Sequence, residues 1–147
     1  MSGNVAQHIP DPAWERTLSD IHRALRDGGV LTFESRNPRA RAWTTLCSVE
    51  PTARTTDHGL LRECMDVDEL RPGRVLLTAY NEFSDTGDLV VEKATLEFRE
   101  RELIERQLSE AGFSVTHVWG DWTRTPTTAD SPLLIFEARS EMSASRR

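Results

Sequence analysis

The stretch that decides the fold is DPAWERTLSDIHRALRDGGVLTFES, residues 11–35. Its apolar side chains fall at the helical spacing i, i+4, i+7 and i+11, which places on one face Trp14, Leu18, Ile21 and Leu25. We therefore predict an amphipathic helix over Pro12–Arg26 that packs on a flat surface. The apolar run after the two glycines predicts a buried strand over Val30–Ser35.

A helix that leads through two glycines into an apolar strand is half of a βαβ unit. Asp11-Pro12 is a typical helix start, and Gly28 suits the left-handed turn that follows a helix. A crossover helix needs a parallel strand before it, but only Met1–Val5 precedes this one, which is too short. The G-x-G turn that holds a cofactor phosphate or ribose in doubly wound folds occurs nowhere in the 147 residues.

The middle of the chain has a strand-like rather than a helical residue pattern. Residues Arg39–Asp57 predict an irregular or short helical connection. Three strand-like runs separated by turn residues then follow, at Leu60–Val67, Arg74–Phe83 and Leu89–Phe98. This spacing predicts an antiparallel three-stranded meander, inserted at about residues 59–98.

The last third returns to a helix followed by strands. Glu100–Ala111 has helical apolar spacing and ends at a glycine, and Ser114–Trp119 and Leu133–Ala138 predict two further strands. Residues 140–147 are small and polar, which predicts a disordered tail. The fold class expected from the residues is therefore α/β, in the order αβ, antiparallel insert, αββ.

The composition limits the classes of binding partner and the cellular compartment that we expect for the protein. The net charge of −6 gives no attraction to nucleic acid or to anionic membranes. No stretch approaches the ~20 apolar residues that span a bilayer, and the N-terminus lacks an apolar signal core. Cys47 and Cys64 lack metal-ligand spacing, so we expect reduced thiols, a cytoplasmic protein and no metal site.

Three segments together resemble the C-terminal half of class I S-adenosylmethionine-dependent methyltransferases. Ser2–Gln7 is similar to the end of the fourth strand of that fold and the loop after it. Leu18–Pro38 is similar to the passage that leads from a helix through two glycines into the fifth strand. The third segment is similar to the last helix and the last two strands, over Phe98–Phe113, Val118–Trp122 and Leu133–Phe136.

The resemblance implies a partial Rossmann-like methyltransferase fold over residues 1–139. It also implies S-adenosylmethionine as cofactor and a small molecule as methyl acceptor. In the family, the glycine-rich loop and the acidic residue that bind the cofactor would lie before Met1, so we expect a truncated chain. Either Met1 is internal to a longer protein, or the gene is truncated and its product is degenerate or needs a partner. The backbone edge of Val30–Phe33 would then be exposed and open to homo-oligomer formation.

The candidate site residues follow the ends of two strands, where open α/β sheets bind ligands. The resemblance implies that Asn4 lies near the reactive methyl group and that residues after the fifth strand face the substrate. We expect substrate contacts from Gln7, Arg36 and Asn37. The planar fork of Arg36 suits an acidic substrate group, with a structural salt bridge as the alternative.

His8 is the nearest candidate for a catalytic base, if the acceptor must lose a proton. Trp119 and Trp122 flank a tight turn, where aromatic rings form a wall of a substrate pocket or attract a sulfonium. We expect His22 and His117 to be structural.

Three functions are compatible with the sequence. The first is a small-molecule methyltransferase that lacks its N-terminal half in this chain. The second is a short non-catalytic homologue that acts as a binding or oligomerising subunit. The third ignores the resemblance and takes the chain as a free-standing α+β ligand-binding domain.

Overall fold

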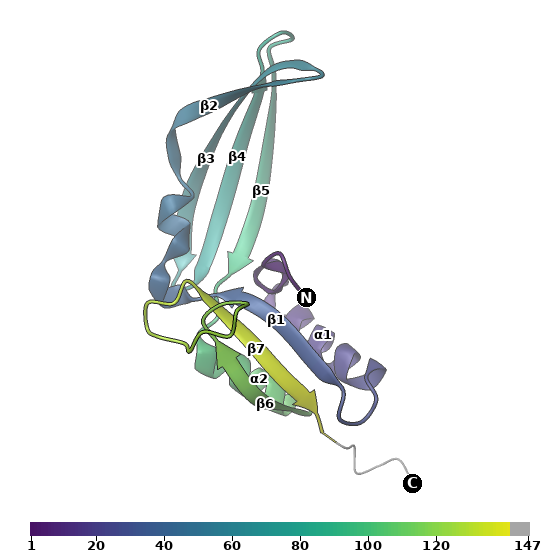
Figure 1. Cartoon of the computed structure of the whole chain (residues 1–147). Helices are drawn as coiled ribbons and strands as arrows, with labels where there is room; N and C mark the ends of the chain where they lie inside the picture. The colour runs from purple at the N-terminus through teal and green to yellow at the C-terminus, as the bar shows by residue number, and fades with distance from the viewer. Residues whose placement is uncertain (142–147) are drawn as a thin grey trace. The chain divides into compact units, whose positions relative to one another are not determined.

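The computed structural model describes residues 1–141, and the chain divides into two compact units (Figure 1). The first unit joins Met1–Ala40 to the chain from Glu97 onward, and the second unit is Arg41–Leu96. The predicted disordered tail lies outside the described residues from position 142. Its first residue, Ser140, belongs to a strand and is buried, which corrects the start of the tail.

The first unit contains two helices and a three-stranded sheet. Its elements are η1 (Val5–His8), α1 (Asp11–Ala24), β1 (Val30–Arg36), η2 (Pro38–Ala40), α2 (Arg101–Glu110), β6 (Phe113–Trp119) and β7 (Leu133–Ser140). The strand order is β1-β7-β6, and both pairs are antiparallel. No helix among residues 1–141 is long and apolar enough to cross a bilayer.

Both helices cover the same face of this sheet. Side chains alternate between the faces of a strand, and on β1 the residues that join the core are Leu31 and Phe33. The Phe33 ring stacks on Phe136 of β7 at 5.2 Å between ring centroids and meets the edge of Trp14 of α1 at 5.3 Å. Leu108 of α2 belongs to the same cluster. The helices lie behind the sheet in Figure 1.

The outer edge of β1 has no strand partner among the described residues. The sequence predicts this open edge at Val30–Phe33. The amino group of Met1 donates a hydrogen bond to the backbone carbonyl of Thr32 at 2.7 Å, so the start of the chain follows the edge without forming a strand. The η1 turn packs beside the same strand.

The second unit is a four-stranded sheet in the order β2-β3-β4-β5. It contains η3 (Ala42–Thr45), β2 (Ser48–Thr56), β3 (Gly59–Arg71), β4 (Arg74–Phe83) and β5 (Asp88–Glu97). β2 and β4 each pair antiparallel with β3.

The three predicted strands of the insert form as β3, β4 and β5, but a fourth strand, β2, joins them where we expected an irregular connection. The strand contains no run of alternating apolar residues, so the period-2 signal is absent. Its threonines favour extended backbone, and its pairing with β3 supplies the rest. Pro51 falls where the register with β3 shifts, a place that tolerates a missing N–H donor on an edge strand.

The predicted start and end of the first helix also need correction. Pro10 is the N-cap, and Asp11 lies in the first turn without capping it through its side chain. The helix ends at Ala24 rather than Arg26. Gly28 does adopt a left-handed conformation with φ +75°, but it lies in the turn into β1, where its N–H bonds to the carbonyl of Ser140.

Arg99 explains why Asp11 does not cap its helix. The guanidinium of Arg99 is 4% exposed and donates to the Asp11 carboxylate at 2.9 Å. It also donates to the backbone carbonyls of Ala6 at 2.8 Å and Ile9 at 2.5 Å. Its carbon Cζ lies 5.0 Å from the ring centre of Trp14. One side chain thus fixes the η1 turn to the start of α1.

We expect Arg99→Lys to lower the free energy of unfolding by about 2–3 kcal/mol, since a lysine ammonium cannot reproduce the planar fork and leaves buried carbonyls without donors. Urea denaturation followed by circular dichroism measures the change.

The matched control is Arg101→Lys, because Arg101 is exposed and pairs with Glu105 one helical turn away. This control should cost less than about 0.5 kcal/mol. Equal losses in the two variants would contradict the role given to Arg99.

Candidate functional site

Glu34 is the centre of the candidate site. It lies near the carboxyl end of β1 and points to the face opposite Phe33, away from the helices. The residue is 7% exposed, and its Oε1 accepts a hydrogen bond from the backbone N–H of Asn4 at 2.7 Å. Its Oε2 accepts from the indole Nε1 of Trp122 at 2.5 Å.

The hydrogen bonds keep this buried carboxyl ionised. Burial raises the pKa of Glu34, but the bonds from Trp122 and from the backbone N–H groups of Asn4 and Gly3 lower it more. The resulting pKa lies below the ordinary value of a glutamate. The side chain is therefore a carboxylate at neutral pH.

The turn before α1 supplies two further polar side chains. Asn4 has a left-handed backbone with φ 56°, and Gln7 is 5% exposed. The side-chain amide oxygens of both residues are buried, and neither has a hydrogen-bond partner in the described structure. Buried polar atoms are rarely left without partners, so these two oxygens mark the turn as a site for a ligand or water.

The loop after β6 brings Trp122 to Glu34. Asp121 shapes the loop, because its Oδ1 accepts from the backbone N–H of Thr123 at 2.8 Å and of Thr125 at 3.1 Å. Hydrogen bonds from Thr125 and then Thr123 lower the pKa of Asp121 to about 2. The Trp122 ring is 50% exposed, so its face is open to solvent while its N–H is fixed.

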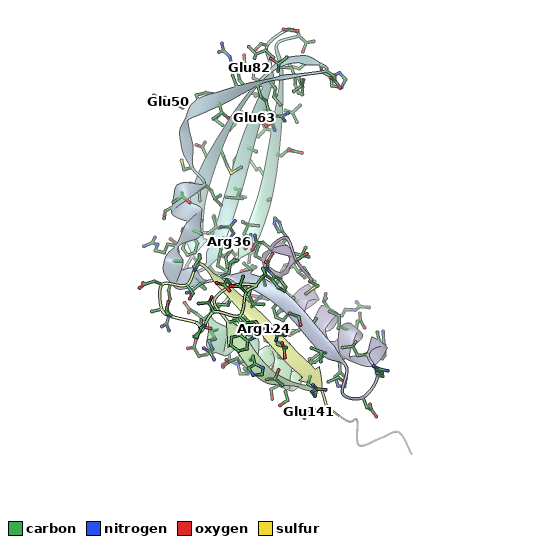
Figure 2. The ribbon with its side chains drawn as sticks, viewed as in Figure 1. Arg36, Glu50, Glu63, Glu82, Arg124 and Glu141 are labelled. Atoms are coloured by element: carbon green, nitrogen blue, oxygen red, sulfur yellow. The ribbon has the colours of Figure 1, made fainter. Side chains whose placement is uncertain are left out.

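Trp119 lies on the same face of the sheet as Glu34. In the strand register, Glu34 is opposite Ile135, and Ile135 is opposite Trp119. The ring of Trp119 stacks on His117 with centroids 4.8 Å apart. His117 lies 3.5 Å from Glu137, which also approaches Arg124 at 3.7 Å. Figure 2 labels Arg124 among the side chains of the first unit.

Arg36 is the last residue of β1, one residue beyond the predicted strand end, and Asn37 follows it, but the environments of the two side chains differ. The Nε of Arg36 is buried and has no partner in the described structure. Asn37 is buried, and its side-chain amide donates to the carbonyls of Ala129 at 3.1 Å and Ser131 at 2.8 Å. The Asn37 side chain thus ties the loop after β6 to the end of β1, whereas the guanidinium of Arg36 keeps unused donor capacity.

Neither His8 nor His22 is among the described hydrogen-bond partners of Glu34. His8 ends the η1 turn and is exposed. His22 contacts the ring of Phe113 edge-on at 5.2 Å and lies 3.3 Å from the Glu141 carbonyl, contacts that suit a structural residue.

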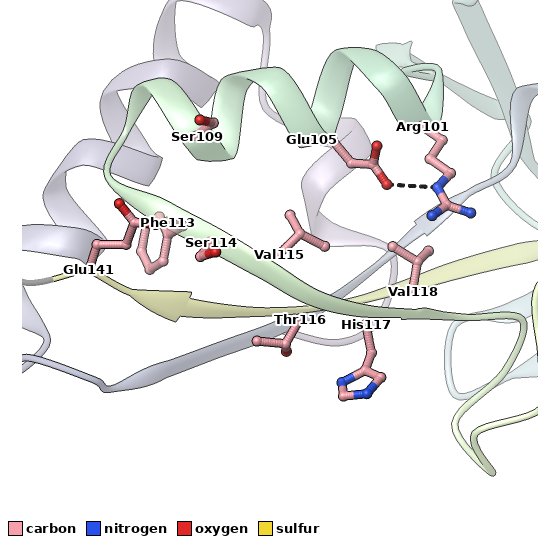
Figure 3. Close-up of a pocket in the computed structure, with 10 residues that line it drawn as sticks. All are labelled: Arg101, Glu105, Ser109, Phe113, Ser114, Val115, Thr116, His117, Val118 and Glu141. Atoms are coloured by element: carbon pink, nitrogen blue, oxygen red, sulfur yellow. Dashed lines mark hydrogen bonds and ion pairs between the residues drawn. The ribbon is translucent and has the colours of Figure 1, made fainter.

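One cavity of the first unit contains none of the predicted site residues. It has a volume of about 560 Å³ and lies between α2 and β6 (Figure 3). Its polar walls include the ion pair of Arg101 with Glu105 at 2.7 Å. Sequence reasoning did not identify this cavity, whose lining has no motif of its own.

Residues 1–141 contain no group of three or more histidine, cysteine or acidic side chains that could hold a metal ion. Cys47 is exposed and Cys64 is partly buried, and both are free thiols.

No protein-family model and no curated protein sequence matches the chain. Solved structures do match it. An S-adenosylmethionine-dependent methyltransferase from Clostridium acetobutylicum aligns with a TM-score of 0.74 and 10% identity, over 96% of this chain and 56% of that one. The CcbJ methyltransferase from Streptomyces caelestis aligns at 0.68 with 14% identity, over 96% and 55%. The chain has a methyltransferase fold.

A third structure agrees with this methyltransferase fold. The sugar N-methyltransferase KedS8 from Streptoalloteichus aligns with a TM-score of 0.63 and 15% identity, over 97% of this chain and 54% of that one. The chain thus spans about half the length of the methyltransferases it matches. These likenesses bear out the partial Rossmann-like class I fold that the sequence resemblance implies.

The structure brings together two of the predicted residues, Asn4 and Trp122, and adds one that sequence reasoning missed. Glu34 follows a run of apolar residues in a predicted strand, and an acidic residue at such a position is usually expected to face solvent. The available signal was its alternation with Phe33, which places it on the face opposite the core. Its partners are 30 and 88 residues away along the chain, and no local pattern reveals them.

We expect Gln7→Met to leave the free energy of unfolding unchanged or to raise it by up to about 1 kcal/mol, because it removes a buried oxygen that has no donor. The control is Gln107→Met. Gln107 is equally buried, but its Oε1 accepts from the Trp14 indole at 3.1 Å. This control should lose about 1–2 kcal/mol in urea denaturation.

The loop around Asp121 should weaken in acid. A folded pKa of about 2, below the ordinary 3.8, means that the Asp121 contribution is present above about pH 4 and is lost as the pH falls through about 2. Unfolding free energies measured across this window should therefore fall less steeply in Asp121→Asn than in the parent chain. The control variant Asp130→Asn, an exposed acid of the same loop, should follow the parent, and identical slopes in all three chains would refute this assignment.

Proposed function

We propose that this chain is part of an S-adenosylmethionine-dependent methyltransferase that acts on a small molecule. The observation that carries the proposal is the meeting of Asn4 and Trp122 at Glu34, beside the carboxyl end of β1. The two residues come from distant segments of the chain, and each donates a hydrogen bond to Glu34. The methyltransferase fold supports the proposal.

S-adenosylmethionine would supply an electrophilic methyl group on a cationic sulfonium. The residues present suit that end of the cofactor. The side-chain oxygens of Asn4 and Gln7 have no hydrogen-bond partner in the described structure and could accept weak hydrogen bonds from the polarised C–H groups beside the sulfonium. The exposed ring of Trp122 could attract the positive charge of the sulfonium. The CalS10 and MtfA methyltransferases, which align at TM-scores of 0.55 and 0.52, are described with S-adenosylmethionine bound.

The roles proposed for the individual residues follow from their places. Asn4 contacts the cofactor near the methyl group. Arg36, with its unused buried donor, binds an acidic group of the acceptor, and Trp119 and Trp122 form the wall that excludes water. His8 takes up the proton of an acceptor that must lose one.

Two predicted substrate residues need a finer description. Asn37 acts on the acceptor through the loop that it holds, since its amide N–H groups already bind Ala129 and Ser131. Gln7 has a free acceptor oxygen and contacts the substrate directly. Free thiols at Cys47 and Cys64 suit a cytoplasmic enzyme.

The glycine-rich part of the cofactor site has no counterpart in these 147 residues. We propose that a segment outside them supplies it. The intact mass of the protein from its source cells should then be nearly twice 16.7 kDa, because the chain spans 55% of the CcbJ methyltransferase.

In the protein of that mass, Asn4→Leu should weaken binding of S-adenosylmethionine by about tenfold or more, as measured by calorimetry, by losing one side-chain hydrogen-bonding group near the methyl end. Thr44→Val, at an exposed hydroxyl of the second unit, is the control and should bind as the parent does. A native mass of 16.7 kDa without cofactor binding would overturn the enzyme proposal.

The open edge of β1 favours a second function, a non-catalytic subunit that pairs this edge with another copy or a relative. Light scattering after gel filtration would then give a stable oligomer of the 147-residue chain. A monomer at micromolar concentration would exclude the function of a self-associating subunit.

A further inference from the structure

A groove runs between α2 and the outer edge of β6 in the first unit, with a volume of about 560 Å³. Its helix wall is formed by Arg101, Glu105 and Ser109, which are spaced four residues apart and therefore share one face of α2. Figure 3 shows Val115 and Val118 on β6 pointing toward this wall. None of the residues proposed for methyl transfer lines the groove, so binding here and methyl transfer are separate properties of the chain.

The backbone edge of β6 that borders the groove is open. Among residues 1–141, the only strand paired with β6 is β7. Phe113 is opposite Ser140, whose N–H and C=O bond to Gly29 and Gly28 on the side of β1. Residue pairs of antiparallel strands alternate between those that exchange hydrogen bonds and those that do not. The N–H and C=O of Phe113 and of Val115 therefore point away from β7, toward the open edge.

The chain itself covers the far end of this edge. Pro126 forms an isolated antiparallel bridge with Trp119. The regular part of the edge stays uncovered over residues 113–115, up to the register shift that ends at His117. A strand added antiparallel to β6 would therefore continue along the same edge on which Pro126 already lies.

β6 lacks the residues with which proteins protect an open strand edge. Its sequence FSVTHVW contains no lysine, arginine, acidic residue or proline. Of the edge strands in the second unit, β2 contains Pro51, and β5 contains Glu92 and Lys93. Unprotected edges pair with other extended chains, and extended peptides bind exposed sheet edges in this way. The edge of β6 is therefore suited to accept a peptide strand.

The charges of the groove favour a basic residue at its Phe113 end. Glu105 already pairs with Arg101 at 2.7 Å, whereas Glu141 has no ion-pair partner within residues 1–141. α2 ends at Glu110, close to this end, and has no basic residue in its last turn. A helix C-terminus carries a partial negative charge. A second copy of the chain, with its net charge of −6, would bring the same negative groups together.

We propose that this groove binds an extended peptide of a partner protein as a strand added antiparallel to β6, with a basic side chain near the C-terminal end of the peptide. An antiparallel peptide reaches the Phe113 end last, where its lysine or arginine meets Glu141 and the C-terminus of α2. Side chains two residues apart share a face of a strand. A small aliphatic side chain two residues before the basic one therefore lies beside Val115, under the helix.

The test uses the full 147-residue chain labelled with ¹⁵N. The reporters are the backbone amide resonances of Phe113 and Val115. The probe is the peptide acetyl-Thr-Val-Thr-Arg-Thr-amide, whose arginine is opposite Phe113 and whose valine is opposite Val115 in the proposed register. One comparison peptide carries glutamate in place of the arginine. The other carries N-methyl groups on the valine and arginine nitrogens, the two donors that face β6.

We expect saturable shifts of both reporter amides with the arginine peptide. The glutamate peptide should bind at least about tenfold more weakly, because it places a like charge beside Glu141. The N-methylated peptide should give no saturable shift, since it cannot donate to the backbone of β6. Equal binding of either comparison peptide, or no binding of the arginine peptide, would overturn the proposal.

Two glutamate variants locate the basic side chain. Glu141→Gln keeps the backbone N–H that bonds to Gly112, and it should lower the affinity for the arginine peptide about threefold to fivefold, the effect of one exposed ion pair. The matched control is Glu102→Gln, because Glu102 lies on α2 outside the groove, 3.8 Å from Arg39. This control should bind as the parent does. Equal affinities in both variants would contradict the placement of the basic residue.

Two further measurements separate a partner peptide from other occupants. Residues 142–147 include Arg146 and Arg147, so a chain that ends at Glu141 would bind the probe more tightly if this segment filled the groove. Dilution of the unliganded chain would shift the reporter amides if a second copy filled it. We expect neither change, and either one would overturn the assignment to a partner. Because no measurement contains S-adenosylmethionine, a failure here leaves the methyltransferase proposal to its own test.

Discussion

The guanidinium of Arg99 is the interaction on which the first unit depends. It donates hydrogen bonds to two backbone carbonyls at the η1 turn and to the carboxylate of Asp11 at the start of α1. The guanidinium also lies over the Trp14 ring. Burial lowers the pKa of Arg99, and the neighbouring carboxylates, Asp11 first, oppose that shift. An arginine remains charged in this environment, so the turn is held by a permanent cation and the candidate site inherits its position from it.

The two faces of the three-stranded sheet have different chemistry because residues alternate along β1. Phe33 faces the helices and stacks on Phe136, whereas Glu34, one residue later, faces the tryptophans of the other side. The core therefore sets the register of β1, and the register sets the direction of the carboxylate. A shift of one residue would bury the acid among rings and expose the phenylalanine.

The sequence predicts the elements whose pattern is local. The helical spacing from Trp14 to Leu25 and the apolar run into β1 identify α1 and β1 to within a few residues, and the glycine at position 112 does take the left-handed turn after α2. β2 escapes prediction because its extended form depends on pairing with β3. Asn4 and Trp122 were identifiable from turn chemistry and family resemblance, but their common partner Glu34 depends on contacts across the fold.

The length of the Glu34 side chain sets the distance between two segments that it joins by hydrogen bonds. One oxygen reaches the turn before α1, and the other reaches the loop after β6. An aspartate at this position would be one methylene shorter and could not span the same gap with both oxygens. The loop after β6 can therefore vary in sequence and length only if it still places an N–H donor beside Glu34. Any loop transplanted into this position must meet the same requirement.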